Sequence, residues 1–154
     1  MNATYIVTSY VVIDDLLTIM NHTDDCRATY SSAEILTVAV VAAKFFQNHH
    51  ERSLCMLQQT GYLPQLSVSR FNRRLHALQD VLMLIVKVLG EMMSSGQVFV
   101  IDTMPVPVCK RVRARRCGKV QGKAYQGYCA SKRDWYFGWQ LHLVCDTAGV
   151  PVAF

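Results

Sequence analysis

The stretch QVFVID at residues 97–102 decides the fold of the second half of the chain. Its β-branched and aromatic residues are typical of a strand, and the apolar side chains predict a place in a sheet core. Asp102 is expected to end this strand, before Pro105 and Pro107. Because an unpaired carboxylate is costly in such a place, an acid there is usually one that binds a cation or a proton. The pattern makes Asp102 a candidate metal ligand and catalytic residue.

A strongly basic segment follows this strand. Residues 110–134 contain nine Lys or Arg residues and one acid, whereas the formal charge of the whole chain is +5. Such concentrated charge indicates a docking surface for a polyanion, with DNA as the favoured partner and a solvated loop as the alternative. The candidate DNA-binding residues of this segment are Lys110, Arg111, Arg113, Arg115, Arg116, Lys119, Lys123, Lys132 and Arg133.

Size and hydropathy bound the class of protein. With 154 residues, of which 51% are hydrophobic, the chain can form one ordinary domain or two small ones. The apolar runs at 35–43 and 81–89 are far shorter than the roughly 20 residues needed to cross a bilayer. The first four residues also lack the basic start of a signal peptide. We therefore expect a cytoplasmic protein without membrane contact.

The cysteines are scattered without a C-x-x-C pair. This spacing predicts reduced and mostly buried thiols rather than a disulfide scaffold. Cys109, Cys117 and Cys129 flank the basic segment and could hold zinc, but ordinary packing is the favoured interpretation.

Helical periodicity dominates the first half of the chain. A first helix is expected over residues 6–20, where apolar residues recur at three- and four-residue spacing. Ser31 and Glu34 match a capping box, which predicts a second helix with a buried stripe. The buried stripe of this second helix would contain Ile35, Val38, Ala42 and Phe46. A third helix is expected over residues 53–59, and Gly61 would end it as a left-handed cap.

A fourth helix is expected from Ser67, its N-cap, to about Met93. Two short helices with a glycine turn, followed by a helix with arginines on its first turns, indicate a helix-turn-helix DNA reader. In that interpretation Arg70, Arg73 and Arg74 contact DNA, and the alternative is a helical bundle with a solvated arginine face. The expected buried residues of this helix are Phe71, Leu75, Leu78, Leu82, Ile85 and Leu89.

The segment SSG at 94–96 interrupts the helical pattern, so we place a boundary between a helical region, 1–95, and a sheet region, 96–154. Alternating residues predict a half-buried strand over 136–145, and residues 146–149 predict a hairpin turn into a partner strand. His142 would lie beside the Asp102 strand, more often as a structural residue than as part of a site.

For four further side chains of the sheet region, a structural or solvated position is the favoured interpretation. Trp135 and Trp139 are expected in the core, with base stacking by Trp135 as the alternative. Tyr128 and Lys132 could position a phosphate, although solvated loop positions are the simpler interpretation.

Three blocks of sequence resemble one known family. They are VFVIDTMPVPVC at 98–109, YQGYCASK at 125–132 and FGWQLHL at 137–143. Together they resemble the start of the catalytic domain in bacterial insertion-sequence DDE transposases, closest to the IS982 group. Residues 67–78 resemble the segment that precedes this domain.

The resemblance implies an RNase H-like fold, in which three carboxylates bind two Mg²⁺ or Mn²⁺ ions. Hard cations prefer oxygen ligands, and two ions about 4 Å apart can activate a nucleophile and stabilise the leaving oxygen. Asp102 matches the first carboxylate, and the other two would lie further downstream than residue 154. The chain is therefore interpreted as a truncated member, and neither Asp134 nor Asp146 is expected to replace the missing ligands.

These expectations combine into an α+β protein with a helical, helix-turn-helix-like region and the opening strands of a truncated RNase H-like domain. The expected function is transposition, meaning DNA binding with metal-dependent strand cleavage and transfer, although the truncated chain alone is expected to be inactive. The alternative is a non-catalytic DNA-binding protein that acts on element ends or inhibits the full-length enzyme. Expected partners are the element ends, target DNA, and a second copy or the full-length transposase.

Overall fold

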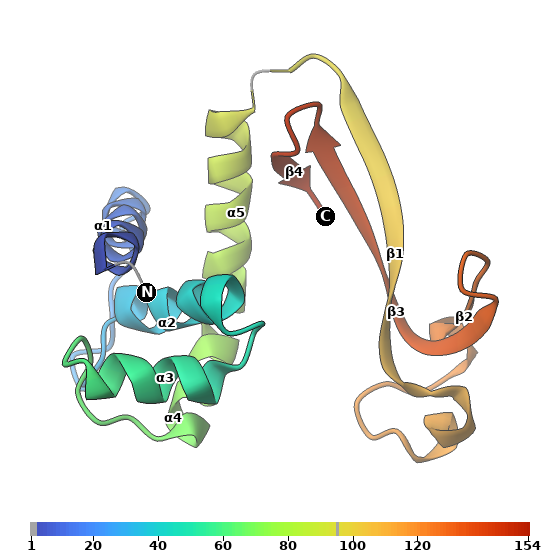
Figure 1. Ribbon diagram of the computed structural model, residues 1–154, viewed down its shortest axis with the longest axis horizontal. Coiled ribbons are helices and arrows are strands. Elements are labelled where there is room, and N and C mark those ends of the chain that lie inside the picture. Colours follow the sequence, from blue (N-terminus) through green and yellow to red (C-terminus); the bar gives the residue numbers. More distant parts are fainter. Residues whose placement is uncertain (1–2, 95) are drawn as a thin grey trace. The chain divides into compact units, whose positions relative to one another are not determined.

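The computed structural model describes residues 3–94 and 96–154. Residues 1 and 2, at the start considered above, and Ser95, which closes the predicted helical region, lie outside the described residues. The fold is α+β, as predicted, with helices first and a small antiparallel sheet after them (Figure 1). Its elements are α1 (Ala3–Ile19), α2 (Ser32–Phe45), α3 (His50–Gln59), α4 (Val68–Ala77), α5 (Gln79–Met93), β1 (Phe99–Lys110), the 3₁₀ turns η1 (Arg111–Arg116) and η2 (Lys123–Tyr125), β2 (Gln126–Cys129), β3 (Asp134–Asp146) and β4 (Pro151–Ala153).

The chain divides into two compact units, Met1–Ile85 and Val86–Phe154, which we call the helical unit and the sheet unit. The division falls within α5, whereas the sequence places a boundary after Ser95. None of the helices within residues 3–94 and 96–154 has both the length and the apolar character that crossing a membrane requires.

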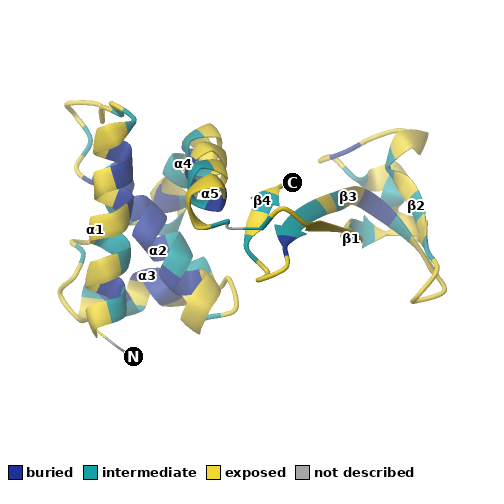
Figure 2. Ribbon diagram, turned by 90° about the horizontal axis from the view of Figure 1, so that it is seen from above, coloured by how far each residue is buried: buried dark blue, intermediate teal, exposed yellow. Residues whose placement is uncertain are grey.

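Helix α2 is the centre of the helical unit, where it packs against α1, α3 and α4. It begins where the capping box predicts, because Ser31 Oγ accepts from the Glu34 backbone N at 3.1 Å and Glu34 Oε2 accepts from the Ser31 backbone N at 2.7 Å. Ile35, Val38 and Ala42 are buried, as predicted, whereas Phe46 is half-buried and caps the C-terminus of the helix. Figure 2 shows this buried stripe along α2.

The predicted first and third helices are both present, although α1 and α3 each begin three residues earlier than the predicted residues 6 and 53, and α3 ends at Gln59 as predicted. Ile6, Ile13 and Leu17 of α1 are buried. Ser67 caps α4 by accepting from the Arg70 backbone N. Gly61 has a φ of +78°, which is the left-handed conformation expected after α3.

The predicted fourth helix is wrong in one respect, because it consists of two helices, α4 and α5, separated at Leu78. No Pro or Gly marks this break, and helical periodicity continues through it. Leu78 is itself buried, as are Phe71 and Ile85, whereas Leu75, Leu82 and Leu89 are half-buried. Packing therefore overrides the local helical preference at this position.

The connection from α3 to α4 also differs from a regular helix-turn-helix. It runs over residues 60–67, which is longer than the roughly 3–4 residues of that turn. The helical unit therefore lacks the turn that the helix-turn-helix interpretation expects at this place.

The sheet is built around β3. Strand β1 pairs antiparallel along one edge of β3, whereas β2 and β4 pair with the beginning and the end of β3 (Figure 1). The predicted strand over 136–145 and the hairpin turn at 146–149 are confirmed. Strand β2 was not expected, because its residues lie in the segment interpreted as a basic loop.

Two predictions about β1 are wrong. The strand does not end at Asp102 but continues to Lys110, because an edge strand tolerates prolines whose missing N–H would face away from the ladder. Its apolar side chains do not enter a sheet core either, since Val100 and Ile101 are 56% and 67% exposed. The physical reason is that the sheet is a narrow ribbon, and such a ribbon leaves apolar side chains in contact with solvent (Figure 2).

Candidate nucleic-acid interface

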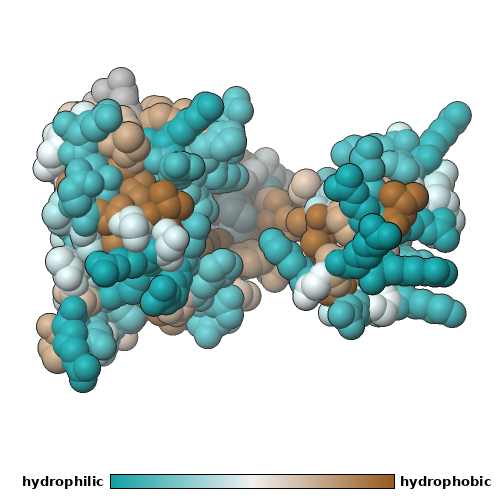
Figure 3. Space-filling view, turned by 90° about the horizontal axis from the view of Figure 1, so that it is seen from below, coloured by the Kyte–Doolittle hydropathy of each residue, from teal (hydrophilic) through white to brown (hydrophobic). Residues whose placement is uncertain are grey.

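All nine basic residues predicted to contact DNA in the sheet unit are exposed. They come from the end of β1, from η1, from the loop before η2, from η2 itself and from the turn between β2 and β3. Within residues 3–94 and 96–154, no ion pair involves any of them. Figure 3 shows long hydrophilic side chains projecting from this part of the sheet unit. The segment therefore presents unneutralised positive charge to solvent.

The 3₁₀ conformation of η1 sets how its arginines are arranged. Side chains three residues apart eclipse in such a turn, so Arg113 and Arg116 lie on the same side. Both line a hollow of about 500 Å³ together with Lys119 and the thiols of Cys109 and Cys117. Three of the predicted DNA contacts are thus gathered around one concavity, where a phosphate would meet several donors at once.

The same hollow holds two neighbouring thiols with different acidities. Desolvation raises the pKa of the Cys109 thiol, and its hydrogen bond with Cys117 raises it further. Hydrogen bonds from the backbone N–H groups of Val120 and Lys119 lower the pKa of Cys117. Cys129 lies elsewhere, and the hydroxyl of Ser131 is the largest cause of its lowered pKa.

The expectation of mostly buried thiols is wrong. Cys26 and Cys55 are exposed, and the other four cysteines are half-buried. The four half-buried cysteines lie in the narrow sheet unit, which covers them only in part, whereas Cys26 lies in the loop before α2 and Cys55 on α3 of the helical unit. Among the described residues, Cys109, Cys117 and Cys129 do not form a three-ligand group of the kind that holds a metal ion.

Asp102 lies in the first third of β1, opposite Leu143, and is exposed. Its Oδ1 accepts from the backbone N of Thr103 at 2.7 Å. A carboxylate is the right donor for Mg²⁺ or Mn²⁺, but two ions need several such oxygens. In the part of the chain that the structure describes, no group of three His, Cys, Asp or Glu residues surrounds Asp102. The described residues therefore do not by themselves fit a two-metal centre.

Asp134 and Asp146, the acids downstream of Asp102, accept hydrogen bonds from nearby backbone N–H groups. Asp146 Oδ1 accepts from the backbone N of Ala148 and of Val150, both at 2.9 Å, and so shapes the β3–β4 turn. Asp134 Oδ1 accepts from the backbone N of Trp135 at 2.8 Å.

His142 lies directly opposite Thr103, whose Oγ1 is 3.0 Å from His142 Nδ1. Directly opposed residues share a face of a sheet, and neighbours along a strand alternate between faces. Since Asp102 is opposed by Leu143, Asp102 and His142 lie on opposite faces. The structure does not bring these two side chains together.

The three arginines of α4 differ in their surroundings. Arg74 Nη2 donates to Asp24 Oδ1 at 3.1 Å and to the carbonyl of Tyr30 at 3.2 Å, which ties α4 to the loop before α2. Arg70 and Arg73 are exposed. Of the three predicted contacts, only these two present their charge to solvent without such ties.

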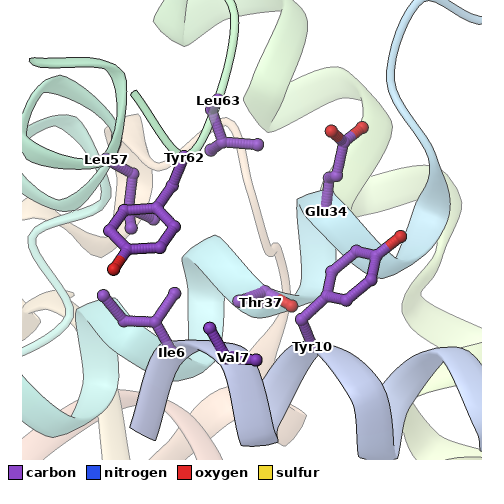
Figure 4. Close-up of a pocket in the computed structure, with 8 residues that line it drawn as sticks. All are labelled: Ile6, Val7, Tyr10, Glu34, Thr37, Leu57, Tyr62 and Leu63. Atoms are coloured by element: carbon purple, nitrogen blue, oxygen red, sulfur yellow. The ribbon is translucent and has the colours of Figure 1, made fainter. Parts of the chain in front are cut away.

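A cavity of about 230 Å³ lies in the helical unit between α1, α2 and the loop after α3 (Figure 4). It is mainly apolar, and two of its polar side chains already serve the helices. Glu34 closes the capping box, and Thr37 Oγ1 donates to the Ala33 carbonyl at 2.7 Å. This arrangement provides packing rather than chemistry.

At the hairpin of β2 and β3, the favoured sequence interpretation of the tryptophans is wrong. Trp135 and Trp139, expected in the core, are 50% and 47% exposed, because the narrow sheet cannot cover them. Tyr128 is similarly exposed and lies opposite Trp135. Treating residues 126–129 as a strand would have paired these two rings across the turn.

Comparison of the chain with protein-family models, with curated proteins and with solved structures finds no match. The resemblance to insertion-sequence transposases therefore rests on the quoted sequence blocks and stays a prediction. The RNase H-like fold stays a prediction as well.

Proposed function

We propose that the chain acts in DNA transposition as a DNA-binding protein related to insertion-sequence transposases, and that its sheet unit holds DNA by the phosphates. The observation that carries this proposal is the set of nine exposed Lys and Arg side chains over residues 110–133, none of which is in an ion pair among the described residues. Neutralising phosphates releases counterions, which is the main driving force of sequence-independent DNA binding.

The arrangement of these cations favours phosphate contact over base reading. Base reading in the major groove needs a helix or strand pair presented to the groove, whereas these residues, apart from Lys110 at the end of β1, lie in 3₁₀ turns and loops. Phosphate contacts position a protein on DNA without reading its sequence. Arg70 and Arg73 on α4 are proposed as the additional contacts that give a preference for element ends.

Asp102 is proposed as one ligand of a Mg²⁺ or Mn²⁺ site, which would supply the nucleophile activation that strand cleavage requires. This part of the proposal rests on the match of residues 98–109 to the transposase pattern. Among the described residues, no group of three His, Cys, Asp or Glu side chains that could hold a metal ion includes Asp102.

The test is a DNA titration across salt concentrations. A fragment of random sequence should bind with a log–log salt slope of about −0.9 for each phosphate contact. Replacing Arg113, Arg115 and Arg116 by Ala should flatten that slope by roughly two to three units. The matched control replaces Arg27, Lys44 and Arg52, which are exposed cations of the helical unit, and should leave the slope unchanged.

Two outcomes would contradict DNA binding by the sheet unit. One is binding that does not respond to salt, and the other is an equal loss of slope in the control triple variant. A nicking assay on supercoiled DNA with Mn²⁺ examines the catalytic part separately. We expect no nicking by this chain alone, and nicking that disappears in Asp102→Ala would instead establish Asp102 as a catalytic residue.

A further inference from the structure

An exposed stack of three side chains lies at the hairpin of β2 and β3. The rings of Tyr128 and Trp135 are 5.2 Å apart between centroids and inclined by 55°. The guanidinium carbon of Arg111, from η1, lies 4.7 Å from the centroid of the Trp135 ring. These side chains come from three elements of the sheet unit, and the two rings are 51% and 50% exposed.

The two faces of this hairpin differ. On one face, Tyr136 lies over Gly127, where an added Cβ would come within 2.3 Å of the Tyr136 ring. On the other face, Tyr128 and Trp135 oppose each other and leave about half of their surface in solvent. One aromatic side chain therefore covers the hairpin, while the opposite pair offers ring surface to a ligand.

We infer that Arg111, Trp135 and Tyr128 form a stacking platform for an unpaired base of single-stranded DNA. The inference rests on the proposed DNA-binding function and deepens it, because it assigns a preferred form of DNA to the sheet unit. Bases stack on aromatic rings with little sequence preference, and an arginine beside the ring adds a cation–π contribution.

The surroundings of the stack favour a single strand. In a duplex, both faces of an internal base are covered by its neighbours, whereas an unpaired base can place one face on a ring. Lys132 and Arg133 lie in the turn that joins the strands of Tyr128 and Trp135, and both are exposed. They provide phosphate contacts next to the rings, so base and backbone would be bound at the same place.

The alternative is that the stack only stabilises the hairpin, as cross-strand aromatic pairs do. Tryptophan fluorescence distinguishes the two readings. The chain has two tryptophans, so a Trp139→Phe variant leaves Trp135 as the single reporter. Oligothymidylate of about 16 nucleotides, a length that covers one typical binding site, should quench this fluorescence. A blunt duplex at equal phosphate concentration should bind with little quenching.

Substitutions then measure the contribution of the stack. Trp135→Ala should weaken binding of oligothymidylate by roughly 5- to 150-fold, while Trp135→Phe should retain most of the affinity. Trp139→Ala is the matched control, because Trp139 lies on the same strand, is similarly exposed, and is not in the stack. Duplex affinity should change less than about twofold in all three variants, because phosphate contacts do not involve the rings.

The outcomes separate this inference from the function on which it rests. Salt-dependent duplex binding, with equal affinities for oligothymidylate in Trp135→Ala and the unchanged chain, would overturn the platform and leave the proposed function intact. Equal quenching of Trp135 by duplex and single strand would also overturn it. Absence of binding to either form of DNA would overturn both. The quenching measurement keeps the stack in place, so it decides the question even if Trp135→Ala does not fold.

Discussion

The helical unit and the sheet unit differ in how far their apolar side chains are buried. In the helical unit, α2 is surrounded by other helices and most buried apolar residues of the described chain gather around it. In the sheet unit, Val120 and Phe137 are the buried apolar side chains among the described residues, whereas most of β1 is exposed (Figure 2). A buried core stabilises the first unit, and strand pairing with a few aromatic contacts stabilises the second.

This difference bears on where a binding surface can form. Burial of apolar area is the largest favourable contribution to folding, so residues used in a core are not available to a ligand. The sheet unit instead presents rings and cations together, at the cost of an exposed apolar edge strand. The comparison leads us to expect a stable helical unit and a less stable, ligand-binding sheet unit.

Hydrogen exchange should show the largest difference between the units. The slowest amides of α2 and α3 should be protected by free energies near that of global unfolding, on the order of 5–15 kcal/mol. Amides of β1 should exchange by opening reactions that cost much less, because few buried contacts hold the strand. Mass spectrometry of exchanged peptides measures both. Equal protection of the α2 and β1 amides from exchange would contradict the expected difference in stability between the two units.

A substitution that creates a cavity in the core of the helical unit should have the next largest effect, in this case on the free energy of unfolding. Phe71 is fully buried, and Phe71→Ala should lower the free energy of unfolding by about 3–5 kcal/mol. Phe45, in the same unit, is 39% exposed and stacks edge-on against Tyr5. Phe45→Ala should therefore cost only about 0.5–1.5 kcal/mol. Urea denaturation measures both changes, and similar costs would mean that burial does not govern the stability of this unit.

Asp24 makes the stability of the helical unit depend on pH. Burial opposes its charged form, but hydrogen bonds from the Ser32 side chain and backbone, with the charges of Arg74 and His22, outweigh this and lower its pKa. A lowered pKa stabilises the fold above the ordinary Asp pKa of about 3.9 and loses this effect as pH falls through the folded value. Asp24→Asn should cost about 1–2 kcal/mol at neutral pH.

The measurement for Asp24 is urea denaturation of both proteins from neutral to acid pH. The difference between them should begin to shrink below about pH 4, where the unfolded-state carboxylate takes up its proton, and should be lost as the pH falls further through the lowered pKa of the native carboxylate. A difference that stays constant down to about pH 2 would show that the charge of Asp24 does not contribute.

Arg74 and Arg73 separate a structural role from a DNA-binding one on the same helix. Arg74→Ala removes the bonds to Asp24 and the Tyr30 carbonyl, so it should lower the free energy of unfolding by about 1 kcal/mol. Arg73→Ala should leave stability within about 0.5 kcal/mol. If Arg73 reads a base, its loss should reduce the preference for element ends by roughly 1–3 kcal/mol. The reverse pattern in denaturation and DNA titration would overturn this assignment.

The smallest expected effect is a difference in alkylation rate between two cysteines of the sheet unit. The Cys117 pKa is lowered by backbone hydrogen bonds from Val120 and Lys119, whereas desolvation raises that of Cys109. Since the thiolate is the reactive form, Cys117 should be alkylated several-fold faster than Cys109 at neutral pH. Peptide mapping after brief iodoacetamide treatment measures the two rates. Faster labelling of Cys109 would mean that these backbone donors do not control reactivity.

Features set by neighbouring residues follow from the sequence. The capping box of Ser31 and Glu34, the N-cap at Ser67, the left-handed Gly61 and the β3–β4 turn each involve residues within a few positions of one another. Their geometry is therefore determined locally, whatever the rest of the chain does. The same holds for the concentration of charge over residues 110–133, which is a property of composition.

Features that join distant residues required the tertiary structure. The break at Leu78, the bond from Arg74 to Asp24, and the stack of Arg111 on Trp135 each depend on which segments come together in space. The apolar stretch at 98–101 illustrates the limit, because its composition predicts a buried strand, whereas its actual burial depends on which segments pack against it. Local preferences can specify a strand, but only the packing of remote segments decides which of its side chains remain in solvent.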